Sequence, residues 1–298
     1  MGKLYITADD FGIDLDRDIG ICVLAIFNVI NSISIIVTNE GSYQRIRRLI
    51  SIIRKCNPNI ELGLHINLTD PQLSLFNLTE ICRKENHLSV SNSKILFYEN
   101  SILNNIEFYK VRSEIDNQLR IYTNIIGRLP NHVDGHNHCH ITNVAIFSYL
   151  HDLCRKYNIH RIRIPREKLN IKEFLKYKKV YDIELDKDLL YLIRTMRENA
   201  LSDILLYESL CKKLTKESSC FCALCKEYEF FGTTYGHIRK IKYLIENIHT
   251  SSGIQELMIH PGFYWPLIKH NTPFSNLDRQ RELFNIIVAK IYWRLNVL

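Results

Sequence analysis

Short apolar strands alternate with longer amphipathic helices along most of this chain, and this alternation limits its fold more than any other feature. Apolar and β-branched runs predict strands at residues 4–9, 32–38, 60–67, 161–165 and 256–259, and a further strand directly after the turn at 127–130. Apolar residues at helical spacing predict helices at 14–30, 42–56, within 102–126, and at 145–157, 238–249 and 278–295. Strands that alternate with helices are typical of a parallel sheet with crossover helices.

The number of these units separates the parallel α/β folds from one another. We count about seven, and no glycine-rich phosphate loop follows the first strand, so a closed or nearly closed TIM-barrel-like α/β fold is favoured over a dinucleotide-binding sheet. The length of 298 residues suits one barrel domain over residues 1–298. We expect loop excursions near 70–100, where the sequence is polar and irregular, and near 170–230, where the pattern is mostly helical.

The charge of the chain gives no indication of a nucleic-acid or membrane partner. The net charge is +7, and the basic residues occur in short patches mixed with apolar residues, as at 45–48 and 176–179. Such patches are typical of the polar faces of helices. The N-terminus leads directly into the first strand, with no apolar stretch long enough for a signal peptide or a membrane span, so we expect a cytoplasmic protein.

The chain contains 9 cysteines, and most stand alone in apolar surroundings, where a buried reduced thiol is expected, as at Cys22 and Cys154. A cluster is formed by Cys220, Cys222 and Cys225. Because no second Cys or His pair follows at zinc-ribbon spacing, reduced thiols in a connecting segment are favoured over a structural zinc site.

Residues 132–140 carry a histidine or an aspartate at every second position. Alternate side chains of an extended strand share a face, so His132, Asp134 and His136 are expected to point together. Imidazoles and a carboxylate on one face each need a partner once they are buried. A metal site would explain the cluster, and a solvated histidine-rich loop is the alternative that this run alone leaves open.

Two adjacent carboxylates, Asp9 and Asp10, end the first expected strand. Strict alternation would place them on opposite faces, so both can serve one site only if the strand breaks there. Gly12 permits such a break. The alternative is that one of the two carboxylates caps the helix that follows.

Two further imidazoles lie at or near the ends of expected strands. His65 and Asn67 share one face of the strand 60–67, and His260 follows the strand 256–259, directly before a Pro-Gly turn. A single histidine on a strand is more often a hydrogen-bonded core residue than a ligand, so neither position is informative by itself.

The joint placement of these clusters is informative, because the carboxyl ends of the strands of a parallel barrel meet on one face. We therefore expect one group of side chains, made of Asp9, Asp10, His65, His136 and His260. One carboxylate and two imidazoles form a common three-ligand set for a divalent ion, and the remaining carboxylate and imidazole can supply a base and an acid. This inventory fits metal-assisted hydrolysis of an amide or an ester.

Four ordered motifs resemble those of the YdjC-like carbohydrate deacetylase family, whose best-known activity is the removal of acetyl groups from chitooligosaccharides. The motifs are Ala8-Asp9-Asp10-Phe11-Gly12, Gly63-Leu64-His65-Ile66-Asn67-Leu68-Thr69, Pro130 with the run 132–140, and His260-Pro261-Gly262. The resemblance extends to residues 281–283 and implies an irregular α/β barrel related to polysaccharide deacetylases. Gly135 and Cys139 depart from the family pattern, which usually has a serine and an aliphatic residue there.

The resemblance also implies a role for each site residue. It assigns the metal ligands to Asp10, His65 and His136. Asp9 takes the position of the general base, and His260 that of the acid or transition-state partner. An arginine that orients a catalytic carboxylate is expected at Arg163, with Arg161 as the alternative.

We therefore expect a hydrolase that removes N-acetyl groups from acetylated amino sugars, with one divalent ion, Mg²⁺ or Zn²⁺, as cofactor and an N-acetylated oligosaccharide as substrate. The alternatives are a metal-dependent hydrolase of another bond, such as a phosphoester, and a non-catalytic sugar- or metal-binding barrel. Phe11, Tyr264 and Trp265 are candidates for stacking on sugar rings, with core or lid packing as the alternative. The sequence leaves the metal, the sugar and the oligomeric state open, and a homo-oligomer is common for such proteins.

Overall fold

The computed structural model describes residues 3–70, 97, 106–163, 228–231, 254–263 and 276–296. The strands are β1 (Lys3–Phe11), β2 (Ser32–Ile35), β3 (Glu61–Ile66), β4 (His132–Gly135), β5 (Arg161–Ile162), β6 (Tyr228–Phe231) and β7 (Ile254–Ile259). The helices are α1 (Leu15–Ile26), α2 (Tyr43–Cys56), α5 (Phe108–Ile126), α6 (Val144–Lys156) and α10 (Asn276–Asn296), with 3₁₀ turns η1 (Glu40–Ser42) and η3 (His136–Ile141).

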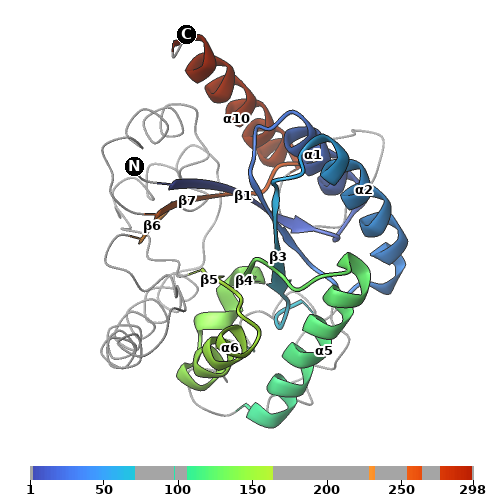
Figure 1. The fold of residues 1–298 in the computed structure, drawn as a ribbon, viewed down its shortest axis with the longest axis vertical. Helices are drawn as coiled ribbons and strands as arrows, with labels where there is room; N and C mark the ends of the chain where they lie inside the picture. Colours follow the sequence, from blue (N-terminus) through green and yellow to red (C-terminus); the bar gives the residue numbers. More distant parts are fainter. Residues whose placement is uncertain are drawn as a thin grey trace.

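The described strands form one sheet of 7 parallel strands in the order β5-β4-β3-β2-β1-β7-β6. The sheet curls, and helices α1, α2, α5 and α6 lie along its outer side (Figure 1). The barrel-like parallel α/β fold expected from the sequence is confirmed. In the described part of the chain it is a half-barrel, with β5 and β6 at its two edges.

Most of the expected elements agree with the observed ones within a few residues, but β6 was not expected. This strand pairs in parallel with β7, and it follows the stretch at 170–225 where the sequence pattern is mostly helical. Its sequence, Tyr-Glu-Phe-Phe, shows no regular alternation, so only its pairing reveals it. The helical pattern at 170–225, the helix at 238–249 and nearly all of the excursion near 70–100 lie outside the described residues.

The two faces of the curled sheet differ in chemistry. Buried apolar side chains cover the outer face, as at Ile33, Leu64 and Val133, and they pack against the helices. The inner face carries buried polar and charged side chains, namely Thr7, Asp9, Ser32, Ser34, His65, His132, Asp134 and Glu256. Strands of this sheet therefore alternate in polarity, whereas a parallel sheet with two apolar faces would show continuous apolar runs.

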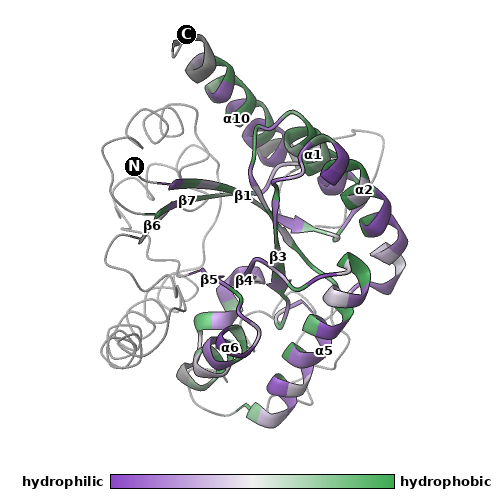
Figure 2. Ribbon diagram, in the orientation of Figure 1, coloured by the Kyte–Doolittle hydropathy of each residue, from purple (hydrophilic) through white to green (hydrophobic). Residues whose placement is uncertain are grey.

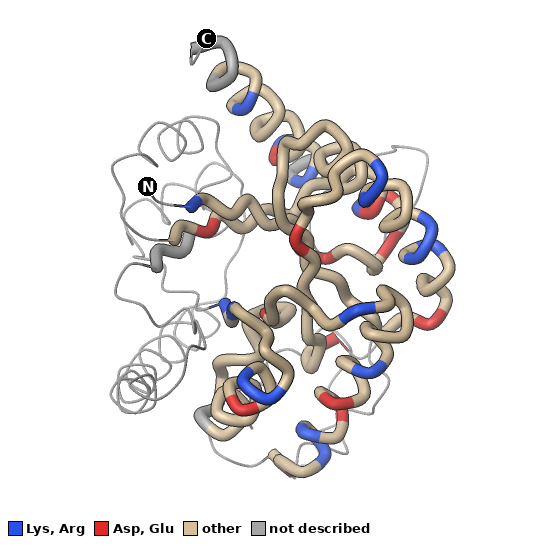
Figure 3. The backbone as a smooth tube through the Cα atoms, in the orientation of Figure 1, with Lys and Arg blue, Asp and Glu red and all other residues tan. Residues whose placement is uncertain are grey.

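Hydrophobic and hydrophilic residues are interspersed along helices α2 and α5 (Figure 2), as expected for helices that bury one side only. On α2, Ile46, Ile50 and Ile53 are buried, and burying one such side chain contributes about 1.5–3 kcal/mol. Arg47 and Arg48 of the same helix are exposed, so the basic patch at 45–48 is a polar helix face. Basic and acidic residues are interspersed along α5 (Figure 3), while the patch at 176–179 lies outside the described residues.

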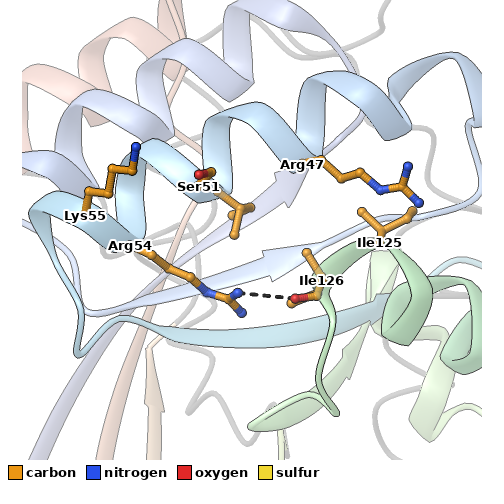
Figure 4. Close-up of a pocket in the computed structure, with 7 residues that line it drawn as sticks. Arg47, Ser51, Arg54, Lys55, Ile125 and Ile126 are labelled. Atoms are coloured by element: carbon orange, nitrogen blue, oxygen red, sulfur yellow. Dashed lines mark hydrogen bonds between the residues drawn. The ribbon is translucent and has the colours of Figure 1, made fainter.

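A shallow pocket of about 330 Å³ separates α2 from α5 and is lined by basic and apolar side chains (Figure 4). Arg54 Nη1 donates to the carbonyl oxygen of Ile126 at 3.2 Å, and Arg47 Nη2 donates to that of Asn124 at 3.5 Å. The last carbonyls of a helix have no partner within the helix, and cations are favourable near them. These arginines therefore join α2 to the C-terminal end of α5.

Two other expectations can be compared with the structure. Cys22, Cys139 and Cys154 are buried and form no disulfide with another described cysteine, while the cluster at 220–225 lies outside the described residues. Among the described helices, none is long and apolar enough to cross a membrane.

Strand β1 breaks at its two carboxylates, as expected. The register between β1 and β2 shifts between Ala8 and Phe11, and Asp10 has a φ of 69°. Aspartate tolerates this left-handed region better than most residues. Neither carboxylate caps α1, because the side chain of Asp14 accepts a hydrogen bond from the backbone N–H of Arg17 at 2.9 Å.

Gly12 completes this break, and we predict that Gly12→Ala destabilises the fold by about 1–3 kcal/mol. Gly12 has a φ of +105°, and a Cβ there would lie 2.4 Å from the backbone oxygen of Ile36. Urea denaturation measures the effect. Gly41→Ala is the control, because its Cβ would meet only the Asn39 side chain at 3.4 Å. Equal stabilities of the two variants would contradict this account of the break.

Candidate metal centre

The carboxyl ends of β1, β3 and β4 bring together the three residues that the sequence suggests as ligands. One donor atom from each of Asp10, His65 and His136 lies within 4.8 Å of the other two. Asp10 Oδ1 is 2.9 Å from His136 Nδ1 and 3.5 Å from His65 Nε2. A carboxylate and two imidazoles that converge on one point form a donor set suited to a divalent ion.

The histidine run follows the strand alternation only as far as Gly135. His132 and Asp134 share the inner face, since both side chains contact Ser34 Oγ. Beyond His136 the chain turns through two left-handed residues, Asn137 with φ 53° and His138 with φ 57°. This turn ends the alternation and gives His140 a different partner, the backbone oxygen of Arg163, at 2.8 Å from its Nε2 atom.

The run is therefore not a solvated loop. His132, Asp134 and His140 are all 0% exposed, and each has a defined polar contact. His136 is more accessible, with 15% of its side chain exposed. A ligand position needs this combination of fixed surroundings and access for the ion.

Asp134 holds the nitrogen of His65 that does not face Asp10. Its Oδ1 atom is 2.8 Å from His65 Nδ1, so a proton on Nδ1 leaves the Nε2 lone pair directed at the Asp10 side. Histidine ligands of metals are usually held in this way by a carboxylate on their second nitrogen. The pair therefore leaves Nε2 as the nitrogen that His65 can offer to a cation.

The charges of the cluster also fit a cation. Burial lowers the pKa of His65, but the carboxylates of Asp134 and Asp9 outweigh burial and raise that pKa to about 10. Burial alone would raise the pKa of Asp10, yet the charge and hydrogen bond of His136 hold it well below its usual value. Carboxylates this close together require positive charge nearby, which a bound divalent ion would supply.

Asp9 belongs to a second group, with His65 and Asp134. Arg163 already supplies its cation. The guanidinium contacts Asp9 through two hydrogen bonds of 2.6 and 2.8 Å and lies 2.8 Å from Asp134 Oδ2. Burial raises the pKa of Asp9 to about 6, although the charge of Arg163 opposes this rise. Of the two candidate donor groups in the described residues, the one with Asp9 and Asp134 therefore already has a cation, and Asp10, His65 and His136 are left as the candidate group for a metal ion.

The two candidate arginines have different partners. Arg163, not Arg161, contacts Asp9, whereas Arg161 lies over the Tyr5 ring at 3.9 Å and forms ion pairs with Glu61 and Glu256 at 3.4 and 2.9 Å. Glu256 was not recognised from the sequence, although it also pairs with Arg163 at 2.9 Å. The signal for it was a single carboxylate inside the apolar strand 254–259.

His260 lies near this cluster, as expected. Its backbone N–H donates to Glu282 Oε2 at 2.6 Å, and its side chain is close enough to Asp10 for each group to influence the pKa of the other. Burial, together with the charge of Arg279, lowers the pKa of His260 to about 3, so its imidazole is neutral. Arg17 and Arg279 also lie near Asp10 Oδ2, at 3.9 and 3.4 Å, and the sequence did not indicate either.

Of the aromatic candidates for sugar stacking, Phe11 is 0% exposed and belongs to the core. Tyr264 and Trp265 lie outside the described residues.

Fold and site together define an α/β half-barrel with a buried Asp-His-His cluster that fits a divalent ion at the carboxyl end of its sheet. The chain belongs to the YdjC-like family, since the family model described as YdjC-like protein matches residues 3–286. The resemblance noted in the sequence is therefore confirmed.

The chain is similar at low identity to several carbohydrate deacetylases. A carbohydrate deacetylase of Mus musculus is 27% identical over 172 residues, which cover 56% of this chain and 51% of the relative. One of Danio rerio is 24% identical over 272 residues, which cover 88% and 82%. The chain thus spans about half the length of the Mus musculus relative.

A solved structure shares the fold. It is described as a cellobiose-phosphate cleavage protein from Enterococcus faecalis V583, and it covers 98% of this chain and 95% of its own chain. The TM-score is 0.63 at 18% sequence identity, which establishes a common fold.

We predict that Arg163→Met destabilises the protein by about 3–5 kcal/mol, because three buried carboxylates lose their shared cation. The substitution removes the ion pairs of Arg163 with Asp9, Asp134 and Glu256. Equilibrium unfolding in urea measures the loss. Arg48→Met, at an exposed position of α2, is the control and should change stability by less than about 0.5 kcal/mol. An Arg163 variant as stable as this control would contradict the importance of the network.

Proposed function

We propose that this protein is a metal-dependent deacetylase that removes N-acetyl groups from acetylated amino sugars. One observation supports it most: Asp9, a carboxylate held by Arg163, lies 4.0 Å from the ligand candidate His65, measured from Oδ2 to Nε2. A fixed base beside a three-donor metal set is the arrangement required for hydrolysis of an amide. Membership of the YdjC-like family and the names of the relatives are consistent with this activity.

Asp10, His65 and His136 would hold the ion, which supplies Lewis-acid polarisation of a carbonyl and a lowered pKa for water. Asp9 would take the proton of the attacking water. The pKa of Asp9 is raised to about 6 by burial, which places this base near neutral pH, where general base catalysis is efficient. Arg163 holds the Asp9 carboxylate in one orientation through two hydrogen bonds.

His260 is the group that we assign to the leaving nitrogen. Because its imidazole is neutral in the resting site, the proton that it passes to the amine must enter during the reaction. The attacking water supplies this proton: Asp9 takes it up and passes it on to His260, which gives it to the nitrogen. Water then contributes hydroxide to the acetyl carbon and a proton to the nitrogen, and the C–N bond breaks to give acetate and a free amino sugar.

The geometry favours this function over hydrolysis of a phosphoester. Phosphoester sites commonly hold two metal ions about 3.5–4 Å apart. Here the second group of carboxylates, Asp9 and Asp134, already surrounds the Arg163 guanidinium. A non-catalytic barrel is less well supported, because such a protein has no need to keep a base and an imidazole beside the donor set.

We extend the proposal to its substrate and cofactor. The substrate is an N-acetylated oligosaccharide of the chitooligosaccharide type, and the cofactor is one divalent ion, Mg²⁺ or Zn²⁺. An Asp-His-His set accepts either ion with small changes of geometry.

We predict acetate release from N,N′-diacetylchitobiose by the metal-loaded protein and none by Asp10→Ala, which lacks the carboxylate ligand. Asp9→Asn should bind the metal but lower kcat by about 10²- to 10⁴-fold, because it cannot accept a proton. Enzymatic assay of acetate and metal analysis of each purified variant provide the measurements. Asp152→Asn, at a side chain 76% exposed on α6, should behave like the parent protein.

Two results would contradict the proposal. If the metal-loaded parent releases no acetate from this or other N-acetylated sugars, the deacetylase function is wrong. If Asp9→Asn keeps the kcat of the parent, Asp9 is not the base.

A further inference from the structure

A chain of hydrogen bonds continues inward from the metal centre, beyond the residues that the proposed reaction uses. Asp134 Oδ1 contacts His65 Nδ1 at 2.8 Å, and Ser34 Oγ donates to Asp134 Oδ2 at 2.6 Å. Ser34 Oγ also lies 3.0 Å from His132 Nε2. Ser34, His132 and Asp134 are each 0% exposed, so water does not compete for these contacts.

The direction of each hydrogen bond in this chain follows from counting protons. A serine hydroxyl has one proton, and Ser34 donates it to Asp134, so its lone pair must accept from His132 Nε2–H. His132 Nδ1 is then a lone pair without a proton. This atom has no hydrogen-bond partner in the described part of the chain, which is less costly for an acceptor than for a donor. Burial, helped by the charge of Arg161, lowers the pKa of His132 to about 4 and keeps it neutral.

Gly63 provides the space for this arrangement. A Cβ at position 63 would lie 2.1 Å from His132 Nε2, so any side chain there would displace the imidazole. Gly63 pairs with Ser34 across β2 and β3, and the next strand, β4, carries His132. The contact between the Ser34 hydroxyl on β2 and the His132 imidazole on β4 therefore depends on the missing side chain of Gly63 on β3.

We propose that Ser34, backed by His132, is a positioning residue for the metal centre. By holding Oδ2 of Asp134, it keeps Oδ1 on His65 Nδ1 and so keeps His65 Nε2 directed at the Asp10 side. The inference rests on the metal site of the proposed function. Arg163 also contacts Asp134 Oδ2, at 2.8 Å, so the competing view is that the guanidinium alone fixes the carboxylate.

Ser34→Ala and Ser32→Ala form a matched pair for the test. Both serines lie on the inner face of β2 and are 0% exposed, but Ser32 Oγ accepts from Arg161 Nη2 at 3.3 Å and is not in contact with Asp134. The measurement is the Kd for Co²⁺ in the full-length protein, by competition with a chelator and without substrate. We expect Ser34→Ala to bind Co²⁺ about 10- to 100-fold more weakly and Ser32→Ala to bind like the parent. Ser34→Cys, which keeps a weak donor, should fall between.

Urea unfolding of the metal-free proteins separates positioning from general structural damage. We expect the two alanine variants to lose similar stability, with only Ser34→Ala losing metal affinity. The inference is wrong if Ser34→Ala binds Co²⁺ as tightly as the parent, if Ser32→Ala loses as much affinity, or if the parent binds no Co²⁺. The Kd measurement uses no substrate, so it does not depend on the deacetylase function. If Ser34→Ala shows the expected loss of Co²⁺ affinity but the parent releases no acetate, only the deacetylase proposal is rejected.

Discussion

The structure depends on one buried cation, the guanidinium of Arg163. It follows β5 at one edge of the sheet, yet it contacts Asp9 on β1 and Glu256 on β7, which are four and five strands away in the sheet order. In a flat sheet these strands would lie roughly 19–24 Å from β5, at about 4.8 Å per strand. Contacts of 2.6 and 2.9 Å are therefore made only because the sheet curls around the guanidinium. Curvature and the ion network depend on each other.

The same network determines where a metal can bind. Removing one partner of a buried ion pair leaves an uncompensated charge, so the inner carboxylates need a permanent cation. Arg163 provides it for Asp9, Asp134 and Glu256, while Asp10 is paired with His136 and lies near Arg17 and Arg279. His65 lies between the two groups and takes part in both. The Arg163 guanidinium therefore balances the charge of Asp9, Asp134 and Glu256, and a bound ion would balance that of Asp10.

Local patterns predicted most of the fold and the ligand candidates, but contacts between strands could not be predicted. Alternating strands and helices gave the parallel architecture, and the Asp9-Asp10 pair required a break in β1, which Asp10 itself carries with a φ of 69°. Ser34 is one of two serines on β2 and Glu256 follows Gln255 on β7, so the local pattern distinguishes neither residue, and their importance comes from partners 100 and 93 positions away in sequence. β6 is recognised only by its pairing with β7. Such relationships exist only once the sheet has formed.

The two departures from the family pattern are explained by the same contacts. A Cβ on Gly135 would lie 2.6 Å from His140 Nδ1 and 3.0 Å from Cys139 Sγ, so the serine that is usual there would crowd both residues. His140 contacts the backbone oxygen of Arg163, and Cys139 Sγ donates to the backbone oxygen of Ile66, next to His65. A glycine at 135 thus leaves the contacts of Arg163 and of the strand that carries His65 undisturbed. Gly135 and Cys139 are neighbours in the structure, so the two departures are coupled. A side chain at position 135 would have to share its space with Cys139 and His140.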